Sequence, residues 1–507
     1  MAAMTRRDWI KTSVATVGLA ALPGTLLAES HTLSSFHYDH VLGTSLDVLL
    51  ETSDAEVLRD AEQVILAEIE RLRCIFSLYD ANSELCRLNN AEAAVPVSTD
   101  LRNVLRTYER WEYVIGGACN PQVGAFVELW TAAQKSGVLP CPGDLKYIAF
   151  FIRSAGWYLD DAAGTVTRIM RYPLNLNIVA KGYVIQQVIA AVKRAVPAIT
   201  GGLVNLGGDM ATWGVSTWPV GIQDPTSPAE NAPLLGGVRL QNQAVATSGG
   251  YQRYYIIDGE RYSHLLDPRS GMPTGHVMSA TVMAPDSVTA NLLATTLCVL
   301  DASEGLRLIA TQPGVECLIV TAAGQILNSP GFKLEPIVKF ADEKKPADVA
   351  KPKGEPWPEG FQVTVPVELP KIDDAKRYRR PYVAVWIEDA SGKAVRTLSV
   401  WGNAPKYLKD LTDWWKISRD DKDLIKAVTR ATRSPGKYDL VWDGKDDKGE
   451  AVGQGTFTVC IEVHREHGRH VRQTGKLDCK AAAATLKLEK NDESGESVIE
   501  YAKKKKS

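Results

Sequence analysis

The sequence has few cysteines and no cysteine motif. Only eight cysteines occur among 507 residues, and none of them forms a C-x-x-C or C-x-x-C-H motif. This excludes a disulfide scaffold, thioredoxin-type chemistry and covalent haem attachment. Most of the cysteines are expected to be buried apolar residues, although Cys460 and Cys479 could pair across neighbouring strands in an oxidising compartment.

The chain also lacks an excess of either charge. It carries 58 Lys and Arg residues against 60 Asp and Glu residues, a formal net charge of −2, which argues against a nucleic-acid partner. Its 40 glycines and 26 prolines are near average, which excludes collagen-like and low-complexity chains. At about 100 to 200 residues per domain, the chain should form two to four folded domains.

Apolar runs long enough to cross a bilayer are absent after residue 28. At the N-terminus, the paired arginines Arg6 and Arg7 stand before the uncharged run 14–28, and this pattern is typical of a twin-arginine export signal. Residues 1–28 are therefore expected to direct the chain to the periplasm, where the mature chain has no membrane span. Leu26 is not the small residue that signal cleavage favours, so an uncleaved signal that anchors the chain stays open.

Helical and strand patterns are mixed up to residue 340, which predicts an α+β domain over 29–340. The expected helices are 55–76, 101–115 and 182–196, and the expected strands are 41–51, 202–206, 253–257 and 280–284. The charged, proline-rich stretch 341–356 has no apolar period and is expected to be a linker.

Short alternating strands follow the linker. They are expected at 361–367, 382–388, 438–442 and 456–463, which predicts a small all-β sandwich over 357–485. Residues 442–457 resemble the last hairpin of immunoglobulin-like modules. Residues 486–507, which end in a run of lysines, are expected to form a charged, solvated tail.

The common nucleotide-binding and hydrolase motifs are missing: G-x-x-x-x-G-K-[ST], G-x-G-x-x-G after a strand, H-E-x-x-H and G-x-S-x-G. Four polar or glycine-dense blocks stand out instead. In the first, Lys181 and Gly182 precede an expected helix, whose free N–H groups and dipole would favour an anion such as phosphate. The alternative is an ordinary helix start with a solvated lysine.

The second block, 205–209, runs from a strand into the double glycine Gly207-Gly208, which would let the backbone approach a ligand closely. A plain turn is the alternative. In the third block, 246–251 and 263–271 place hydroxyls, His264, Asp267 and Arg269 within a short stretch. His264 could act as a general base, or could be a structural histidine.

The fourth block places Asn291 and Thr295 four residues apart, on one face of an expected helix. Their side-chain oxygens suit a hard cation, and capping or core packing is the alternative.

In their order and spacing, these blocks resemble the FAD:protein FMN transferases, the ApbE-type flavin transferases. The resemblance covers about half of the chain and passes through Leu42-Gly43-Thr44, Phe76-Ser77, Ser83-Glu84-Leu85 and Leu88-Asn89 to Thr295. It implies one α+β catalytic domain that moves FMN from FAD onto a Ser or Thr hydroxyl of another exported protein. AMP would be released, and Mg²⁺ would bind the pyrophosphate.

The resemblance also assigns roles to individual residues. Lys181, His264 and Asp267 would be catalytic, and the Ala180 carbonyl with the Asn291 and Thr295 side chains would hold the metal. The residues that would bind FAD are Leu42, Lys181, Gly182, Asn205, Gly207, Gly208, Asp209, Ser248, Gly249, Tyr251 and Arg269.

The chain departs from the family at five positions where aspartate is usual. These positions hold Asn120, Asn175, Gln186, Gly250 and Asn291. Loss of a carboxylate at Asn291 removes several kcal/mol of attraction for a divalent ion. We therefore expect Mg²⁺ to be held mainly together with the FAD pyrophosphate. Hydrolysis of FAD to FMN and AMP, flavin binding without catalysis, and a purely structural role remain alternatives.

Overall fold

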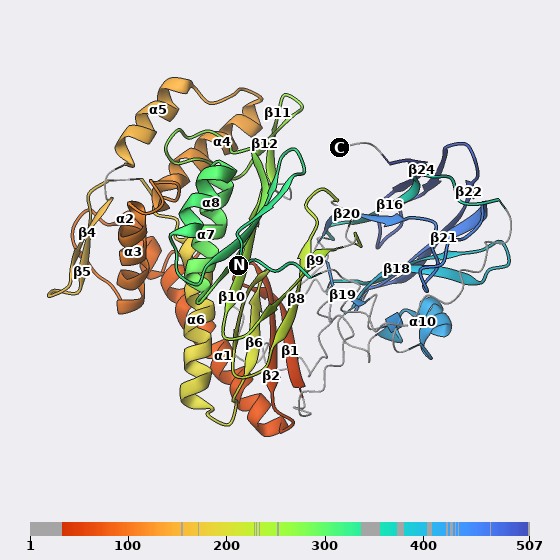
Figure 1. Ribbon diagram of the computed structural model, residues 1–507, viewed down its shortest axis with the longest axis horizontal. Helices are drawn as coiled ribbons and strands as arrows, with labels where there is room; N and C mark the ends of the chain where they lie inside the picture. The colour runs from red at the N-terminus through yellow and green to blue at the C-terminus, as the bar shows by residue number, and fades with distance from the viewer. Residues whose placement is uncertain are drawn as a thin grey trace. The chain divides into compact units, whose positions relative to one another are not determined.

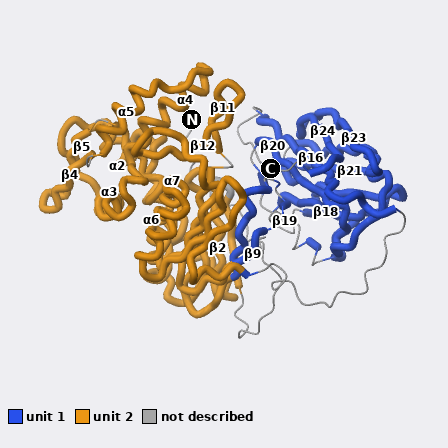
Figure 2. Tube along the Cα trace, turned by 45° about the horizontal axis from the view of Figure 1, so that its top comes forward, with its two compact units in different colours: residues 1–27, 219–237, 335–507 blue, residues 28–218, 238–334 orange. Residues whose placement is uncertain are grey.

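The computed structural model describes most of the chain, in two compact units that are coloured separately in Figure 2. The described residues are 33–153, 156–170, 172–227, 229, 231–232, 234–250, 253–335, 355–372, 380–402, 408–421, 424–425, 429–430, 432–433, 435–466 and 468–504. Among them, the α+β unit comprises 33–218 and 238–334, and the β unit comprises 219–237 and 335–504. The expected export signal and almost all of the expected linker lie outside the described residues.

An eight-stranded antiparallel sheet forms the centre of the α+β unit (Figure 1). Its order is β1-β2-β6-β7-β10-β13-β14-β15. The bounds are β1 (Leu33–Val41), β2 (Thr44–Glu51), β6 (Gly202–Leu206), β7 (Asp209–Trp213), β10 (Ala244–Gly249), β13 (Val277–Ala284), β14 (Glu316–Thr321) and β15 (Ile326–Asn328). The mixed helix and strand pattern is thus confirmed as an α+β fold.

Four helices lie side by side over one face of this sheet (Figure 1). They are α1 (Ala55–Phe76), α6 (Asn177–Ala195), α7 (Ser287–Val299) and α8 (Ala302–Ala310). Helix α1 begins where Asp54 accepts hydrogen bonds from two backbone N–H groups, and it buries one apolar face that includes Leu58, Ile65 and Leu72. Helix α7 is apolar on nearly all sides, because it packs between α6 and the strands β10 and β13.

Smaller elements complete the unit. They are α2 (Glu84–Asn90), β3 (Val95–Pro96), α3 (Thr99–Glu112), the 3₁₀ turn η1 (Pro121–Val123), α4 (Gly124–Ser136), α5 (Pro142–Phe151), β4 (Trp157–Asp160), β5 (Thr165–Arg168), β11 (Tyr254–Ile257) and β12 (Glu260–Ser263). β8 (Trp218–Gln223) and β9 (Leu234–Leu240) form a separate two-stranded sheet.

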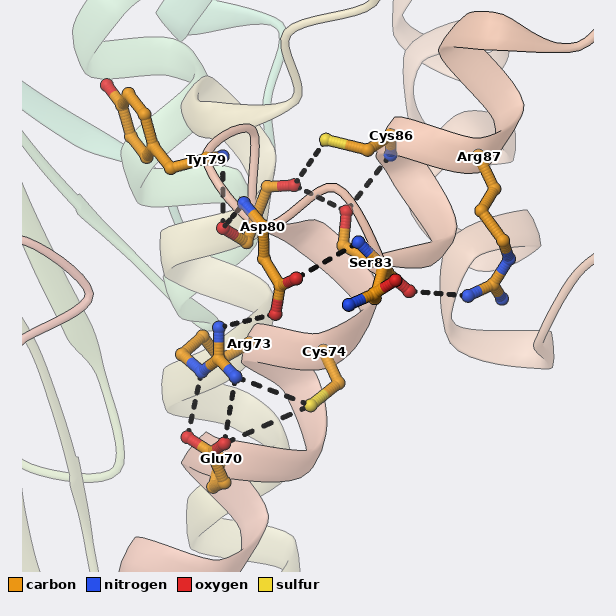
Figure 3. A network of polar contacts seen from close by, with 10 residues as sticks. Glu70, Arg73, Cys74, Tyr79, Asp80, Ser83, Cys86 and Arg87 are labelled. Atoms are coloured by element: carbon orange, nitrogen blue, oxygen red, sulfur yellow. Dashed lines mark hydrogen bonds and ion pairs between the residues drawn. The ribbon is translucent and has the colours of Figure 1, made fainter. Parts of the chain in front are cut away.

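The turn between α1 and α2 is held by side chains (Figure 3). Arg73 binds Glu70 within α1, and its Nη1 also donates to Asp80 Oδ2 at 2.9 Å. Ser77 Oγ accepts from the backbone N–H of Asp80 at 3.1 Å, and Ser83 Oγ donates to the Ser77 carbonyl at 2.6 Å. Ser77 and Ser83, which belong to two of the motifs that carry the family resemblance, therefore stabilise this turn through their side chains.

The expected start of one helix was wrong. Helix α6 begins at Asn177, five residues earlier than the sequence indicated, so Lys181 and Gly182 lie within the helix. The glycine is needed for packing, because a Cβ at Gly182 would lie 2.4 Å from the backbone oxygen of Ser287 in α7. Ser287 Oγ also donates to the Gly182 carbonyl at 2.6 Å.

The β unit contains two antiparallel sheets that share one apolar core, as the all-β sandwich prediction required. One sheet has the order β20-β16-β24-β23, and the other, β19-β18-β17-β21-β22, adds the short parallel strand β19. The bounds are β16 (Phe361–Leu369), β17 (Tyr382–Glu388), β18 (Ala394–Trp401), α10 (Thr412–Ser418), β19 (Thr429–Arg430), β20 (Gly436–Trp442), β21 (Gly455–His464), β22 (His470–Cys479), β23 (Ala484–Leu488) and β24 (Ser497–Lys503).

The prediction of a solvated tail over 486–507 was wrong. Strand β24 pairs with both β16 and β23, and it buries Ile499 and Tyr501 completely. Alternation of apolar and charged residues in 497–503 marks a half-buried strand, which the lysines that follow had obscured.

Residues 219–237 belong to the β unit, although the sequence placed them in the first domain. The Asn231 carboxamide pairs with Val441 on the edge strand β20, where Nδ2 donates to the carbonyl at 2.7 Å and Oδ1 accepts from the N–H at 2.8 Å. Asn231 thus satisfies main-chain groups that an edge strand leaves open.

All eight cysteines are free. Cys460 lies opposite Thr474 and Cys479 opposite Gly455, so the two cysteines are too far apart along the ladder to pair. No helix within the described ranges is both long enough and apolar enough to cross a membrane.

The buried side of β24 generates a stability prediction. Ile499→Ala should lower the free energy of unfolding by about 2 to 5 kcal/mol, because it empties a closed core site. Val498→Ala, on the 44% exposed neighbouring side chain, should cost less than about 1 kcal/mol. Urea unfolding of the full chain would measure both, and equal effects would show that 497–503 is a solvated tail after all.

Candidate active site

An open pocket of about 390 Å³ lies in the α+β unit. Its polar lining consists of Asn120, Asn175, Asn177, Lys181, Asp209, Thr247, Ser248, Arg253, His264, Asn291 and Thr295, with Gly249 between them. The apolar lining consists of Ala118, Val123, Val127, Ile178, Leu265, Leu266, Pro268 and Val299. The first, third and fourth sequence blocks therefore meet at one place, and Asp209 joins them from the second.

A buried carboxylate lies at the centre of the lining. Asp209, at the start of β7, is 4% exposed, and its Oδ2 binds Lys181 Nζ at 3.0 Å and Asn291 Nδ2 at 2.5 Å. Burial raises the pKa of the Asp209 carboxyl, while the Lys181 ammonium and the Asn291 amide act to lower it. These three side chains fasten α6, β7 and α7 to one another at the pocket.

Oxygen atoms from α7 and β10 lie next to this cluster. Thr295 follows Asn291 by one helical turn, and its Oγ1 lies 3.0 Å from Ser248 Oγ at the end of β10. The backbone carbonyl of Ser248 accepts a hydrogen bond from Cys298 Sγ at 3.3 Å. The arrangement presents an amide and two hydroxyls, all of which carry oxygen ligands of the kind hard cations prefer.

The N-terminus of α6 faces the same pocket, and there Asn175 Oδ1 accepts from the Asn177 N–H at 3.1 Å while the Leu176 carbonyl accepts from the N–H groups of Val179 and Ala180. Asn175, Asn177 and Ile178 line the pocket at this end of the helix. The preceding segment is fixed by Asn89, which donates to the Leu174 carbonyl at 3.0 Å and accepts from its N–H at 2.8 Å. The Ile178 N–H is left without a hydrogen-bond partner among the described residues, and this donor and the helix dipole favour an anion at the helix start.

His264 and Arg253 flank the pocket on the other side. His264 Nδ1 lies 2.9 Å from the Arg253 carbonyl, and because a carbonyl only accepts, Nδ1 carries the proton and Nε2 has the free lone pair. Partial burial lowers the pKa of His264 below its ordinary value, so the ring is neutral at neutral pH. The charged side chains of the lining are then Lys181, Arg253 and Asp209, which together give the pocket a net positive charge.

Four expected FAD-binding residues lie outside the pocket lining and support a turn instead. Asn205 Nδ2 donates to Asp47 Oδ2 at 3.0 Å, and its Oδ1 accepts from the Gly208 N–H at 2.9 Å. Gly207 has a φ of +62° and lies against Thr44, and Leu42 forms the adjacent β1–β2 turn with a φ of +51°. Leu42, Asn205, Gly207 and Gly208 therefore belong to turns outside the pocket lining, and a role for them in FAD binding stays a prediction.

Asp267 and Arg269 also bind each other and do not line the pocket. Arg269 Nε donates to Asp267 Oδ1 at 2.9 Å, and the Asp267 carboxylate raises the pKa of the guanidinium. The Asp267 carbonyl closes the turn by accepting from the Gly271 N–H at 2.7 Å. This turn leads into the pocket wall at Leu265, Leu266 and Pro268, and a catalytic role of Asp267 stays a prediction.

The other residues expected to bind FAD or the metal differ in whether they line the pocket. Ala180 and Gly182 are buried in α6 outside the lining, while Gly249 contributes to it. Tyr251 lies outside the described residues.

Three of the five positions without the usual aspartate, Asn120, Asn175 and Asn291, line the pocket as neutral amides. Gln186 is exposed on α6, and a side chain at Gly250 would collide with Ser263 Oγ at 2.4 Å. No cluster of three or more His, Cys, Asp or Glu side chains suited to a metal occurs in the described part of the chain.

Sequence reasoning missed Asn177, Arg253 and Thr247 as lining residues. Arg253 was expected only as the first residue of a strand, and its proximity to His264 depends on the pairing of β11 with β12. Asn177 was missed because the start of α6 was placed too late.

Comparisons with known proteins agree with this architecture. Residues 42–319 match the model of the ApbE family, and residues 362–496 match a family described as predicted periplasmic protein (DUF2271). The FAD:protein FMN transferase of Klebsiella pneumoniae is 29% identical over 267 residues, which cover 52% of this chain and 82% of the relative. That of Escherichia coli is 26% identical over 307 residues, covering 58% and 86%.

The fold comparison leads to the same family. The crystal structure of the ApbE protein from Thermotoga maritima superposes with a TM-score of 0.53 at 26% identity, covering 59% of this chain and 97% of that protein. Since the family match at 42–319 includes most of the sheet, the helices of the α+β unit and the whole pocket, and spans more than half of the 507 residues, the chain belongs to the ApbE family.

Proposed function

We propose that the chain transfers FMN from FAD to a Ser or Thr hydroxyl of an exported acceptor protein and releases AMP. The observation that carries this proposal is the pocket that combines Lys181, the start of α6 and a neutral His264 within one lining. An anion site next to a base is what phosphoryl transfer to a hydroxyl requires. The curated relatives described above bear the name of this activity.

The diphosphate of FAD would lie at the start of α6. Lys181 and Arg253 supply positive charge there, and the Ile178 N–H, which has no hydrogen-bond partner among the described residues, supplies an oriented donor. Asp209 keeps the Lys181 ammonium at the pocket wall through the 3.0 Å contact. Charge-assisted hydrogen bonds of this kind contribute about 1.5 to 3 kcal/mol each.

The side chains of Asn291, Thr295 and Ser248 fit Mg²⁺ in the chemistry of their oxygen atoms. They offer no carboxylate, and Asp209 is already occupied by Lys181 and Asn291. The substrate diphosphate would therefore provide the charged ligands. Bound in this way, Mg²⁺ would offset negative charge on the phosphoryl oxygens.

His264 would act as the general base. Its Nε2 takes the proton of the acceptor hydroxyl, while Nδ1–H stays on the Arg253 carbonyl and holds the ring. The hydroxyl oxygen bonds to the phosphorus on the FMN side, and the bond between that phosphorus and the bridging oxygen breaks. AMP leaves with the bridging oxygen.

An exported enzyme fits the remaining features. The paired arginines before residue 14 support export through a twin-arginine signal, and the β unit resembles a predicted periplasmic family. We assign the protein to the periplasm on these two grounds, where its acceptor would also be located.

One assay tests the function directly. The full chain is incubated with FAD, Mg²⁺ and the apo form of an exported flavoprotein, and both AMP and the acceptor mass are measured. The proposal requires an acceptor heavier by one FMN residue for each AMP released. Free FMN and AMP with unlabelled acceptor would indicate a hydrolase, and FAD binding without AMP would indicate a flavin-binding protein.

Removing the lysine should weaken FAD binding. Lys181→Gln should raise the Kd of FAD about tenfold or more, because it removes one charge-assisted contact and leaves Asp209 without its ammonium. Calorimetry would measure this. Lys193→Gln, on the exposed end of the same helix, is the matched control and should not change the Kd.

The transfer rate should depend on the protonation of His264. A general base works when neutral, and burial lowers the pKa of His264 below about 6.5. The rate should therefore be constant at neutral pH and fall as the pH drops through the lowered pKa. His264→Ala should lose about 10²-fold to 10⁴-fold in rate, together with this acid limb.

His276→Ala is the control for His264, because the His276 ring binds the Leu300 carbonyl outside the pocket. An acid limb that persists in the His264→Ala variant would remove the base assignment.

Restoring an acid at residue 291 should strengthen metal binding. Asn291→Asp places a second carboxylate against Asp209, which destabilises the metal-free protein and attracts Mg²⁺. The Kd of Mg²⁺ without FAD should fall at least about tenfold. Asn177→Asp adds the same charge to the pocket away from Asp209 and controls for charge alone. Tight Mg²⁺ binding to the unmodified protein without FAD would contradict the account.

A further inference from the structure

Helix α5 is apolar on two faces, and the α+β unit covers only one of them. The helix lies at the outside of the unit, next to α4 (Figure 1). Its inner face buries Leu145, Ile148 and Ala149 in one apolar cluster with side chains of α4. A surface helix normally has polar side chains on its outer face. The outer face of α5 departs from this pattern.

The outer face carries a cluster of aromatic rings. The side chain of Tyr147 is 62% exposed, and that of Phe150 is 70% exposed. The partly buried Phe151 joins them, because its ring centroid lies 4.7 Å from that of Tyr147 and 5.3 Å from that of Phe150. Exposed apolar side chains that contact one another mark an interaction site, whereas single exposed ones are common on any protein.

The segment around α5 has an excess of positive charge. Within 135–153, Lys135, Lys146 and Arg153 are exposed cations and Asp144 is the one acid, whereas the whole chain has a net charge of −2. None of these three cations has an ion-pair partner among the residues that the structure describes. Exposed rings between cations fit a partner that is apolar inside and anionic at its surface.

The size of the aromatic cluster argues against a folded protein as this partner. A Phe or Tyr side chain buries about 150 to 250 Å², so three partly exposed rings offer on the order of 300 Å². A stable protein interface takes about 800 Å² from each partner. A lipid bilayer requires no matching surface, because single rings enter between the headgroups while Lys and Arg side chains bind the phosphates.

We propose that the outer face of α5 binds the surface of an anionic lipid bilayer. Tyr147 and Phe150 would enter the boundary between headgroups and acyl chains, and Lys146 and Arg153 would bind headgroup phosphates. This inference rests on the expected export of the chain, which brings it next to a membrane. It does not depend on the proposed transfer reaction.

Helix α5 is also connected to the pocket. The Ile152 carbonyl, at the C-terminal end of α5, accepts a hydrogen bond from Asn120 Nδ2 at 2.7 Å, and Asn120 lines the pocket. Binding of α5 to a bilayer would therefore hold the pocket close to the membrane surface. A substrate held at the same membrane would then meet the pocket at a raised local concentration.

Vesicle flotation of the full chain tests the aromatic contact. Vesicles of phosphatidylglycerol and phosphatidylcholine in equal parts should bind the chain at least tenfold more strongly than vesicles of phosphatidylcholine alone. The double variant Tyr147→Ser, Phe150→Ser should bind the mixed vesicles at least tenfold more weakly. The matched control Tyr79→Ser, Tyr113→Ser removes two rings that are 97% and 90% exposed outside α5, and it should bind like the unaltered chain.

A charge reversal tests the electrostatic part of the contact. Lys146→Glu together with Arg153→Glu should weaken binding to the mixed vesicles at least tenfold. Added salt should weaken binding of the unaltered chain in the same direction, because it screens exposed charges. All four side chains are exposed, so each variant should keep the urea unfolding midpoint of the unaltered chain.

Hydrogen exchange measured by mass spectrometry locates the contact on the chain. Amides of 142–151 should exchange at least threefold more slowly on the mixed vesicles than in solution. The variant Tyr147→Ser, Phe150→Ser should lose this protection. Because exchange is measured at α5 itself, the result does not depend on whether the apolar run 14–28 also binds lipid.

Two results would overturn the proposal. One is failure of the unaltered chain to bind the mixed vesicles, and the other is exchange over 142–151 that is as fast on the vesicles as in solution. Neither result affects the proposed transfer of FMN, which is assayed in solution without lipid.

Discussion

The site depends on one buried contact, in which the Asp209 carboxylate binds the Lys181 ammonium and the Asn291 amide. A buried carboxylate without such partners would be strongly destabilising. Because the three residues come from β7, α6 and α7, satisfying the carboxylate fixes these elements against one another. The same contact directs the lysine to the pocket wall and places the start of α6 beside it.

The chemistry of the lining follows from this arrangement. Asn120, Asn175 and Asn291 line the pocket with neutral amides and Asp209 is its one carboxylate, so the pocket has little negative charge of its own. Such a lining is better suited to an anionic substrate than to a free divalent ion. Under the proposed function, substrate and metal would therefore bind together, and the substrate would bring most of the charge that holds the metal.

The sequence predicted regular elements well where a periodic pattern was long. Helix α1 and strand β6 have the expected bounds, because their apolar spacing is regular and their ends carry clear signals. Helix α6 was placed too late, since no capping residue marks its start and the glycine inside it resembled a boundary. Strand β24 was missed because charged residues alternate with its buried ones.

For the site, the sequence identified the blocks but not which residue in each block faces the pocket. Glycine-rich turns look alike whether they approach a ligand or only reverse the chain, and Gly207-Gly208 forms a turn outside the pocket lining. Pairing of Asp267 with Arg269 two residues later is equally invisible without the turn that joins them. Arg253 entered the site through strand pairing, which composition and spacing alone do not determine.

The most direct test of the central claim is a crystal structure of the full chain with FAD. The account predicts the diphosphate at the start of α6, within hydrogen-bond distance of Lys181 Nζ, with His264 Nε2 facing the phosphorus on the FMN side. FAD bound elsewhere on the chain, or a pocket that stays empty at saturating FAD, would contradict it.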